Sequence, residues 1–463
     1  MSMTSSAALA AALASAGRVA RVIDFPTVDA LLSEMDALAQ MHPTAIRRTL
    51  LGHSRQGEPI EEFAIGNGSR HFVIVGGVHP NEPIGFRTIE HLAHELLDDE
   101  TLTLGLDATW HLVPCIDPDG TRLNEAWFGA PSDRVGYARN FYRPAPDEQV
   151  EWSFPFVYKR ARFDRPLPET RALMALCDRV RPALFVGLHN AELGGVYYYA
   201  TKALPGLVDA LMAIPREFGL PADVGEPESA ELERLGGAVF RTPLARERYD
   251  YLDARGIDPA GEVSGGGSAD YLQQFGTFCL VAELPYWTHE DAADTSPSGV
   301  SYRDVLRDKA LDLRKLAVML STTLTAVSMD LALDTPFRRA TTAFAHLMGS
   351  LADAEQQRAD AEADRVATRA EVFSNEDVVR CFRLRFGGMM LRMLDAECTA
   401  GTATATVRRE RDRFAAVYDH WCTEAESVPG IEPLPIAHLV GVQVASTLVA
   451  ATLLNNDRES VHR

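Results

Sequence analysis

The chain has 463 residues, of which 46% are hydrophobic and 24% charged, enough for two or three domains with a large buried core. It carries 45 Lys and Arg residues against 65 Asp and Glu residues, and the resulting formal charge of −20 repels phosphate backbones. We therefore expect no nucleic acid partner. Because apolar residues are spread along the chain, we also expect no membrane span.

The N-terminal residues 1–25 are rich in alanine but lack the basic start of a secretory signal. We expect a leader that is disordered or helical, with export as the less favoured alternative. The six cysteines form no CxxC pair, a pattern typical of reduced thiols. The sequence therefore predicts a cytoplasmic protein.

Short, nearly continuous apolar runs alternate with helical patterns from the leader to about residue 300. The runs are typical of strands buried on both faces, and they are His71–Val78, Trp110–Ile116, Ala183–His189, Val196–Ala200 and Thr277–Leu284. Helices are expected at Ile84–Leu97, Glu169–Val180, Leu207–Phe218 and Ala269–Phe275. This alternation predicts an α/β domain over residues 26–330, with a mixed, mostly parallel central sheet flanked by helices.

Strand patterns stop beyond about residue 300. Helices are expected over residues 302–328, 336–372, 376–397, 403–425 and 435–455. We therefore expect an all-α C-terminal domain at residues 331–463. Its last helix is apolar enough to be buried within this unit or against a second subunit, which makes the C-terminal helices a candidate surface for a homo-oligomer.

A His and a Glu follow the first apolar run, at the turn into a helix. His79 and Glu82 stand three positions apart after Gly76 and Gly77. Imidazole nitrogen and carboxylate oxygen are both zinc ligands, and sites in α/β sheets form at the carboxyl ends of strands. Alone, the pair is a weak pattern, for which a surface His beside a helix N-terminal Glu is the commoner meaning.

Two more polar residues end apolar strands of the same domain. His189 ends the run Ala183–His189, either bonded to its own loop or as a third ligand in a His₂Glu set that leaves one position open. Glu283 is acidic inside an apolar strand, which is costly unless it pairs with a cation or serves as a general base beside a metal-activated water.

Arg122 and Arg139 lie in the segment between these ligand candidates. Arg122 follows the turn Asp117–Gly120, and Arg139 precedes Asn140. Each is an ordinary surface arginine by default. Near a metal, one could stabilise an oxyanion and the other could hold a substrate carboxylate in a bidentate fork.

In their order along residues 45–300, these motifs resemble the zinc carboxypeptidases of the M14 family, with the carboxypeptidase A-like fold. The motifs that carry the resemblance are the hairpin-like segment Arg48–Gly66, Gly76–Glu82 (GGVHPNE), Asp117–Gly120 (DPDG, where the family usually has Asn-Pro-Asp-Gly), Ala138–Phe141 (ARNF), Pro168–Leu173 (PETRAL), the LHN that holds His189, Gly266–Tyr271 (GGSADY) and the strand of Glu283.

The resemblance implies one zinc ion (Zn2+) per chain, bound by His79, Glu82 and His189. It implies that Glu283 is the general base and later the proton donor to the leaving amine. Arg122 would polarise the scissile carbonyl.

The same resemblance implies that Arg139 and Asn140 lie at the substrate, with Arg139 on a free C-terminal carboxylate. Two positions depart from the family pattern, since Ala138 replaces the usual Asn and Glu262 falls where the family has a mobile Tyr. Ala269 falls at the position that sets side-chain preference and implies a hydrophobic pocket.

The sequence therefore predicts zinc-dependent hydrolysis of an amide bond, with removal of a C-terminal residue from a peptide or peptide-like small molecule. One alternative is an aspartoacylase-like deacylase or amidase that acts on a small acylated amino acid. Another is a catalytically inactive member that binds a peptide or a partner protein.

Overall fold

A mixed sheet forms the centre of the protein in the computed structural model, which describes residues 5–259 and 264–461. In these residues it has nine strands, in the spatial order β1 (Ile46–His53), β2 (Pro59–Ile65), β4 (Ala108–Val113), β3 (Arg70–Val75), β7 (Leu184–His189), β11 (Phe278–Glu283), β8 (Tyr197–Ala200), β10 (Val239–Arg241) and β9 (Arg234–Gly236). The central strands β4, β3, β7 and β11 are parallel, while β1, β2, β8 and β9 each have an antiparallel neighbour. The predicted fold class is confirmed.

Helices cover both faces of the sheet, as the continuous apolar strands predict. Within β3, Phe72 and Ile74 belong to one buried cluster and Val73 and Val75 to the other. The first cluster includes residues of α1 (Ser5–Ala16), α2 (Val28–Met41), α3 (Ile84–Asp98), α8 (Leu207–Glu217) and α15 (Ile436–Val461). The second includes residues of α7 (Pro168–Val180) and α10 (Ser268–Leu272).

The remaining elements of the α/β part are short. They are α4 (Pro118–Arg122), α5 (Glu125–Phe128), α6 (Arg134–Asn140), α9 (Ala245–Asp253), β5 (Phe156–Tyr158), β6 (Ala161–Phe163) and β12 (Trp287–Thr288). Most of them lie in the connections at the carboxyl ends of the central strands, where the candidate site residues are found.

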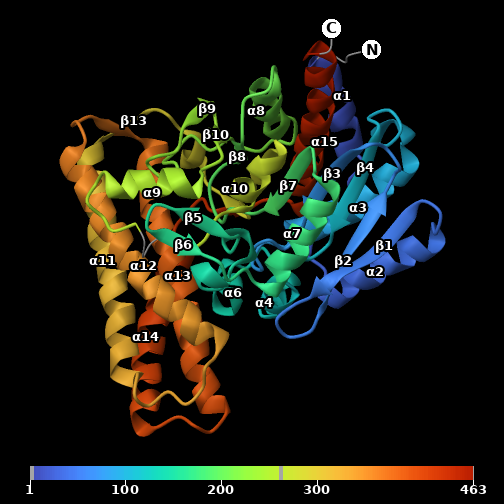
Figure 1. Ribbon diagram of the computed structural model, residues 1–463. Helices are drawn as coiled ribbons and strands as arrows, with labels where there is room; N and C mark the ends of the chain where they lie inside the picture. Colours follow the sequence, from blue (N-terminus) through green and yellow to red (C-terminus); the bar gives the residue numbers. More distant parts are fainter. Residues whose placement is uncertain (1–4, 260–263, 462–463) are drawn as a thin grey trace.

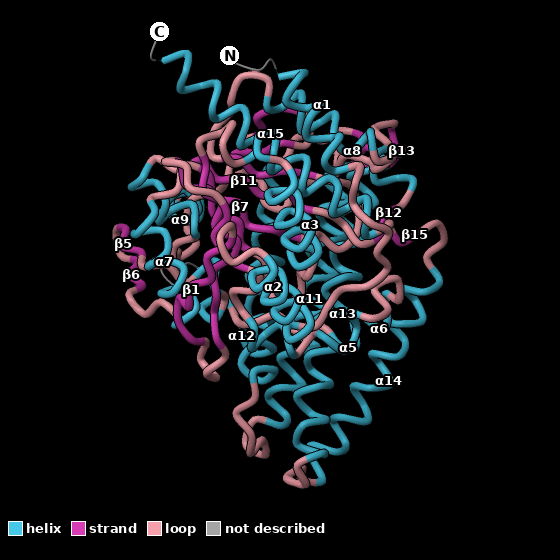
Figure 2. The backbone as a smooth tube through the Cα atoms, turned by 90° about the vertical axis from the view of Figure 1, so that its right-hand side faces the viewer, coloured by secondary structure: helices cyan, strands magenta, loops and turns pink. Residues whose placement is uncertain are grey.

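Four long helices, α11 (Tyr302–Val327), α12 (Pro336–Ala361), α13 (Arg369–Thr399) and α14 (Ala405–Ser427), form a bundle beside the sheet (Figures 1 and 2). The expected helix over 336–372 is interrupted after Ala361. The chain leaves the helix after Ala361, and β14 (Val366–Thr368) pairs with β13 (Pro297–Ser301). Thr368 and Glu371 then form a capping box that starts α13, a local signal that marks a new helix.

The last helix, α15, lies on the sheet and not in the bundle. It follows the short strand β15 (Glu432–Pro433) and packs against α1, α3, α8 and the strands β7 and β11 (Figure 1). The C-terminal region is helical, as expected, and within it α15 packs on the α/β part and apart from α11–α14. The boundary at residues 330/331 stays a prediction. The apolar surface of α15 is used within the same chain, so it gives no support for a homo-oligomer.

By length and composition alone, Ile436–Asn456 of α15 could cross a membrane. In the fold, 83% of its most apolar window is buried inside the protein, as in the core helix of a globular domain. Within the leader, Ser5–Ala16 forms the helix α1, and residues 17–25 are not helical. Helix α1 lies against α15 and buries Ala8, Ala12 and Ala16.

The bundle is joined to the α/β part through α13 and α6. A Cβ atom on Gly388 would lie 2.3 Å from the carbonyl oxygen of Ala138, so only glycine allows this close approach. Arg392 of α13 donates hydrogen bonds to the carbonyl oxygens of Leu123, Asn140 and Phe141. The bundle thus fixes the segment that follows α6.

Candidate active site

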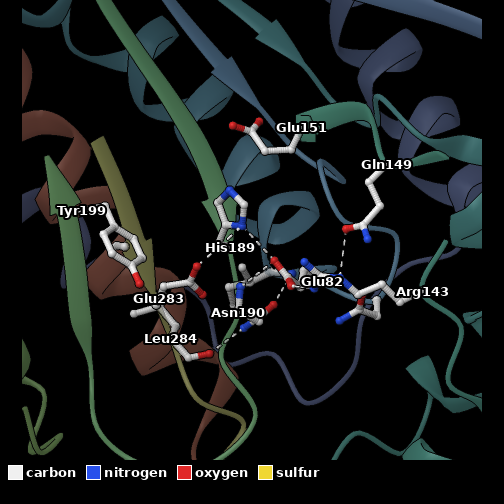
Figure 3. Close-up of polar contacts among 12 residues, drawn as sticks. Glu82, Arg143, Gln149, Glu151, His189, Asn190, Tyr199, Glu283 and Leu284 are labelled. Carbon is white, nitrogen blue, oxygen red and sulfur yellow. Dashed lines mark hydrogen bonds and ion pairs between the residues drawn. The ribbon is translucent and has the colours of Figure 1, made fainter. Parts of the chain in front are cut away.

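The three predicted ligand residues converge at the carboxyl ends of two adjacent central strands. His79 and Glu82 lie in the connection from β3 to α3, and His189 is the last residue of β7. One potential ligand atom from each residue lies within 4.8 Å of the others, and all three side chains are buried. Figure 3 shows His189 and Glu82 facing each other.

These residues fit a zinc ion. Two imidazoles and one carboxylate are a known donor set for catalytic zinc. The Nδ1 atom of His79 is buried without a hydrogen bond partner, as a metal ligand would be before it binds the ion. Burial and the charge of Arg143 lower the pKa of His79 well below its ordinary value, which favours the neutral form that binds metals.

Glu82 connects both sides of the site. Its Oε2 accepts a hydrogen bond from His189 Nδ1 at 2.9 Å, and its Oε1 accepts one from Arg143 Nη1 at 2.8 Å. Burial opposes ionisation, but His79, His189 and Arg143 outweigh it and hold the pKa of Glu82 below its ordinary value. The ligand carboxylate is therefore ionised.

Glu283 ends β11 directly beside His189, its register partner on β7. Its Oε1 lies 3.8 Å from His189 Nδ1. Burial, together with the charges of Glu82 and Glu228, raises the pKa of Glu283 to about 8. A carboxyl group with a pKa near neutrality can both accept and return a proton, as a general base must.

Asn190 holds the loops of the site together, a role that sequence reasoning missed. Its Oδ1 accepts hydrogen bonds from the backbone N–H of Ile84 and the hydroxyl of Tyr286, and its Nδ2 donates to the carbonyl oxygen of Leu284 (Figure 3). In the sequence, the position of Asn190 directly after His189 was the signal that could have indicated this role.

Gly187 makes room for the His189 ring. A Cβ atom at this position would lie 2.9 Å from His189 Nε2. This close approach explains why the strand has a glycine inside an otherwise apolar run.

Among the described residues, the contacts of the predicted catalytic Arg122 and of the predicted substrate-binding Arg139 do not include the ligand residues. Arg122 binds Asp29 at 2.7 Å and Glu58 at 3.0 Å. Arg139 binds Asp419 of α14 at 2.8 Å, with its guanidinium 5.3 Å from the Tyr418 ring centroid.

Asn140 donates to the carbonyl oxygen of Gly136 within α6, so its amide closes its own helix. Ala269 is buried in the second apolar cluster, and Ala138 is buried under α13. Glu262 lies outside the described residues. The roles of these residues remain predictions.

Arg143 is the arginine that the structure places against the ligands, and no sequence motif singled it out. Besides Glu82, it binds Gln149, with its Nε 3.0 Å from Gln149 Oε1, and lies 5.5 Å from the ring centroid of Trp152. The Trp152 ring is also edge-on to His79, at 5.6 Å between centroids. Contacts with Glu82, Gln149 and Trp152 thus hold the Arg143 side chain in place.

A cavity of about 140 Å³ lies next to these loops and reaches α12. Arg55, Asp119 and Tyr142 from the α/β part line it together with Pro336 and Arg339 from the bundle. The bundle and the α/β part therefore share the walls of this cavity, and none of His79, Glu82, His189 and Glu283 is among the residues that line it.

Comparison with known proteins identifies the family. Residues 31–285, more than half of the chain, match the zinc carboxypeptidase (M14) family. A curated relative, zinc carboxypeptidase A 1 of Anopheles gambiae, is 26% identical over 187 residues, which cover 36% of this chain and 42% of the relative. The match thus spans less than half of that relative's length.

Two solved structures are also similar, though remotely. Bovine thrombin-activatable fibrinolysis inhibitor in complex with tick carboxypeptidase inhibitor matches with a TM-score of 0.38 and 11% identity, over 56% of this chain and 86% of that chain. Carboxypeptidase A from Helicoverpa armigera matches with a TM-score of 0.39 and 13% identity, over 76% of this chain and 79% of that chain. The family match, and the buried His79, Glu82 and His189 that fit its metal, show that the chain belongs to the zinc carboxypeptidase family.

Proposed function

We propose that this protein hydrolyses an amide bond in a peptide or peptide-like substrate, with removal of a C-terminal residue. The observation that carries the proposal is the convergence of His79, Glu82 and His189, with Glu283 on the adjacent strand 3.8 Å from His189. The family match supports a peptidase and gives no support to an aspartoacylase-like deacylase.

The zinc ion that these residues fit supplies Lewis acidity and makes water acidic enough to act as a nucleophile near neutral pH. Glu82, ionised by its neighbours, contributes the negative charge of the donor set. His79 and His189 would bind the ion as neutral imidazoles. Glu82 and Glu283 raise the pKa of His189 to about 9 against the effect of burial, so His189 would lose a proton when the ion binds.

Glu283 moves the proton in the proposed reaction. Its carboxylate takes a proton from the attacking water while the water oxygen bonds to the carbonyl carbon. It then gives that proton to the amide nitrogen as the carbon–nitrogen bond breaks. The products are a shortened peptide with a new carboxyl group and a free amino acid. A carboxyl group with a pKa near 8 is suited to both halves of this transfer.

The test is hydrolysis of a panel of short peptides by the zinc-loaded protein, followed by mass spectrometry, with Glu283→Gln as the key variant. We expect stepwise loss of C-terminal residues, and a fall in kcat of about 10²–10⁴-fold in the variant at unchanged zinc content. Cleavage of N-acyl amino acids alone would favour the deacylase. Full activity in Glu283→Gln would contradict the assigned base.

A further inference from the structure

Arg143 is the guanidinium nearest to the reacting centre among the arginines considered for catalysis. It contacts the ligand Glu82 directly, at 2.8 Å. Arg122 is instead held by Asp29 and Glu58, and Arg139 by Asp419. Both of these arginines are paired with carboxylates that are not among the candidate site residues.

The fork of Arg143 is fixed before any substrate binds. Gln149 accepts from its Nε, and Gln149 itself is oriented by donating from its Nε2 to the carbonyl oxygen of Pro144. The chain just before Arg143 is anchored by Arg392 of α13, which binds the carbonyl oxygens of Asn140 and Phe141. A guanidinium held in this way loses little conformational freedom when it binds a ligand.

The guanidinium of Arg143 also has N–H groups that these contacts do not use. A guanidinium has five N–H groups, and the described contacts use those on Nε and Nη1. Nη2 has no acceptor among the described residues, and 16% of the side chain is exposed to solvent. The guanidinium also acts electrostatically on both His79 and Glu283. Its unused N–H groups therefore lie beside the ligand Glu82.

We propose that Arg143 donates a hydrogen bond to the oxyanion that forms on the scissile carbonyl oxygen, the role that the resemblance assigned to Arg122. This inference rests on the proposed function. A preorganised cationic donor in a buried site stabilises the charge that develops in the transition state, and it changes the ground state little. Arg143 is thus a catalytic residue that the family motifs do not identify.

The test compares Arg143→Gln and Arg143→Lys with Arg122→Gln, and with Arg165→Gln as an exposed control. For Arg143→Gln we expect kcat/KM on a cleaved peptide to fall about 10²–10³-fold, mostly in kcat, with zinc content unchanged by mass spectrometry. Arg143→Lys should recover part of the activity, Arg122→Gln should lose less, and Arg165→Gln should behave as wild type.

A binding measurement separates this inference from the proposed function. Calorimetric titration of the zinc-loaded protein with a phosphinic dipeptide, which mimics the tetrahedral intermediate, should show affinity lost in Arg143→Gln by the same factor as kcat/KM. If the wild type cleaves no peptide, the proposed function is overturned, and this titration still tests Arg143.

Three results would overturn the inference. The first is equal affinity of the phosphinic dipeptide for wild type and Arg143→Gln. The second is loss of zinc from Arg143→Gln, which would make Arg143 only a support for Glu82. The third is a fall in kcat for Arg122→Gln as large as for Arg143→Gln.

Discussion

Glu151 lies on the side of the His189 ring that faces away from Glu82 (Figure 3). Its Oε1 accepts hydrogen bonds from the backbone N–H and the hydroxyl of Ser268, while its buried Oε2 has no partner among the described residues. The charges of Glu151 and His189 stabilise each other. A carboxylate that supports a ligand histidine from behind orients the ring and strengthens metal binding.

Glu151→Gln is therefore expected to bind zinc about 10–100-fold more weakly, as measured by competition with a chelator of known affinity. Ser268→Ala is the matched control, because it removes the hydroxyl partner of Glu151 and keeps the charge beside His189. Equal zinc affinity in Glu151→Gln and wild type would show that Glu151 has no part in metal binding.

Asp117 stands where the family usually has Asn, and it caps α4 by accepting a hydrogen bond from the backbone N–H of Gly120. Burial raises the pKa of Asp117 to about 7, and the charges of Glu169 and Asp119 add to the effect. Its Oδ2 is buried without a partner. The carboxylate form is therefore unfavourable in the folded protein.

Between about pH 4 and pH 7 the folded protein keeps a proton on Asp117 that the unfolded chain has lost. The free energy of unfolding should then fall as pH rises through this range. Asp117→Asn keeps the cap and cannot ionise. We expect its stability relative to wild type to rise by about 2–4 kcal/mol from pH 4 to pH 8 in denaturant unfolding. A difference in stability between the variant and wild type that does not change with pH would contradict a buried Asp117 carboxyl group with a raised pKa.

At the scale of elements, α15 supports the two strands that end at His189 and Glu283. Its buried Gln443 donates from Nε2 to the carbonyl oxygens of His189 and Ala282, each at 3.0 Å. These two hydrogen bonds to the ends of adjacent strands explain why a polar residue lies at the centre of this apolar helix.

Gln443→Leu should leave both carbonyl groups buried without a donor. We expect a loss of about 1–3 kcal/mol in the free energy of unfolding, measured with denaturant, together with weaker zinc binding if the strand ends shift. Thr447→Val is the matched control, because the Thr447 hydroxyl donates to the carbonyl oxygen of Gln443 within the same helix. Equal losses in both variants would show that the bridge has no special role.

At the scale of the whole molecule, the bundle and the α/β part share a buried charge network. Arg385 of α13 forms an ion pair with Glu192, in the loop that follows His189. Arg134 of α6 lies 3.7 Å from the same Glu192 and binds Asp377 of α13 at 3.1 Å. The helical bundle therefore stabilises the loop next to a ligand residue.

Arg385→Met should destabilise the protein by about 3–5 kcal/mol, because it leaves the charge of Glu192 buried and only partly compensated. Arg383→Met on the same helix is the control. It removes a more exposed pair with Asp312, for which we expect about 1 kcal/mol or less. The added change Glu192→Gln should restore part of the lost stability, and no restoration would contradict the pairing.

The amino-acid sequence alone determined the buried central strands, most helices and the ligand candidates. Continuous apolar runs and the polar residues that end them are local patterns, so His79, Glu82, His189 and Glu283 could be predicted before their geometry was known. Parallel strands bring such ends to one edge of a sheet.

Only the tertiary structure decided where α15 packs and which arginine meets the ligands. An apolar helix has the same pattern whether it completes a bundle or a sheet, and the partner that buries it lies far along the chain. Likewise, Arg122, Arg139 and Arg143 carry the same guanidinium group, and no local pattern shows which of them lies at the metal ligands. Their carboxylate partners Asp29, Asp419 and Glu82 are brought near by folding, and these distant contacts fix the place of each guanidinium.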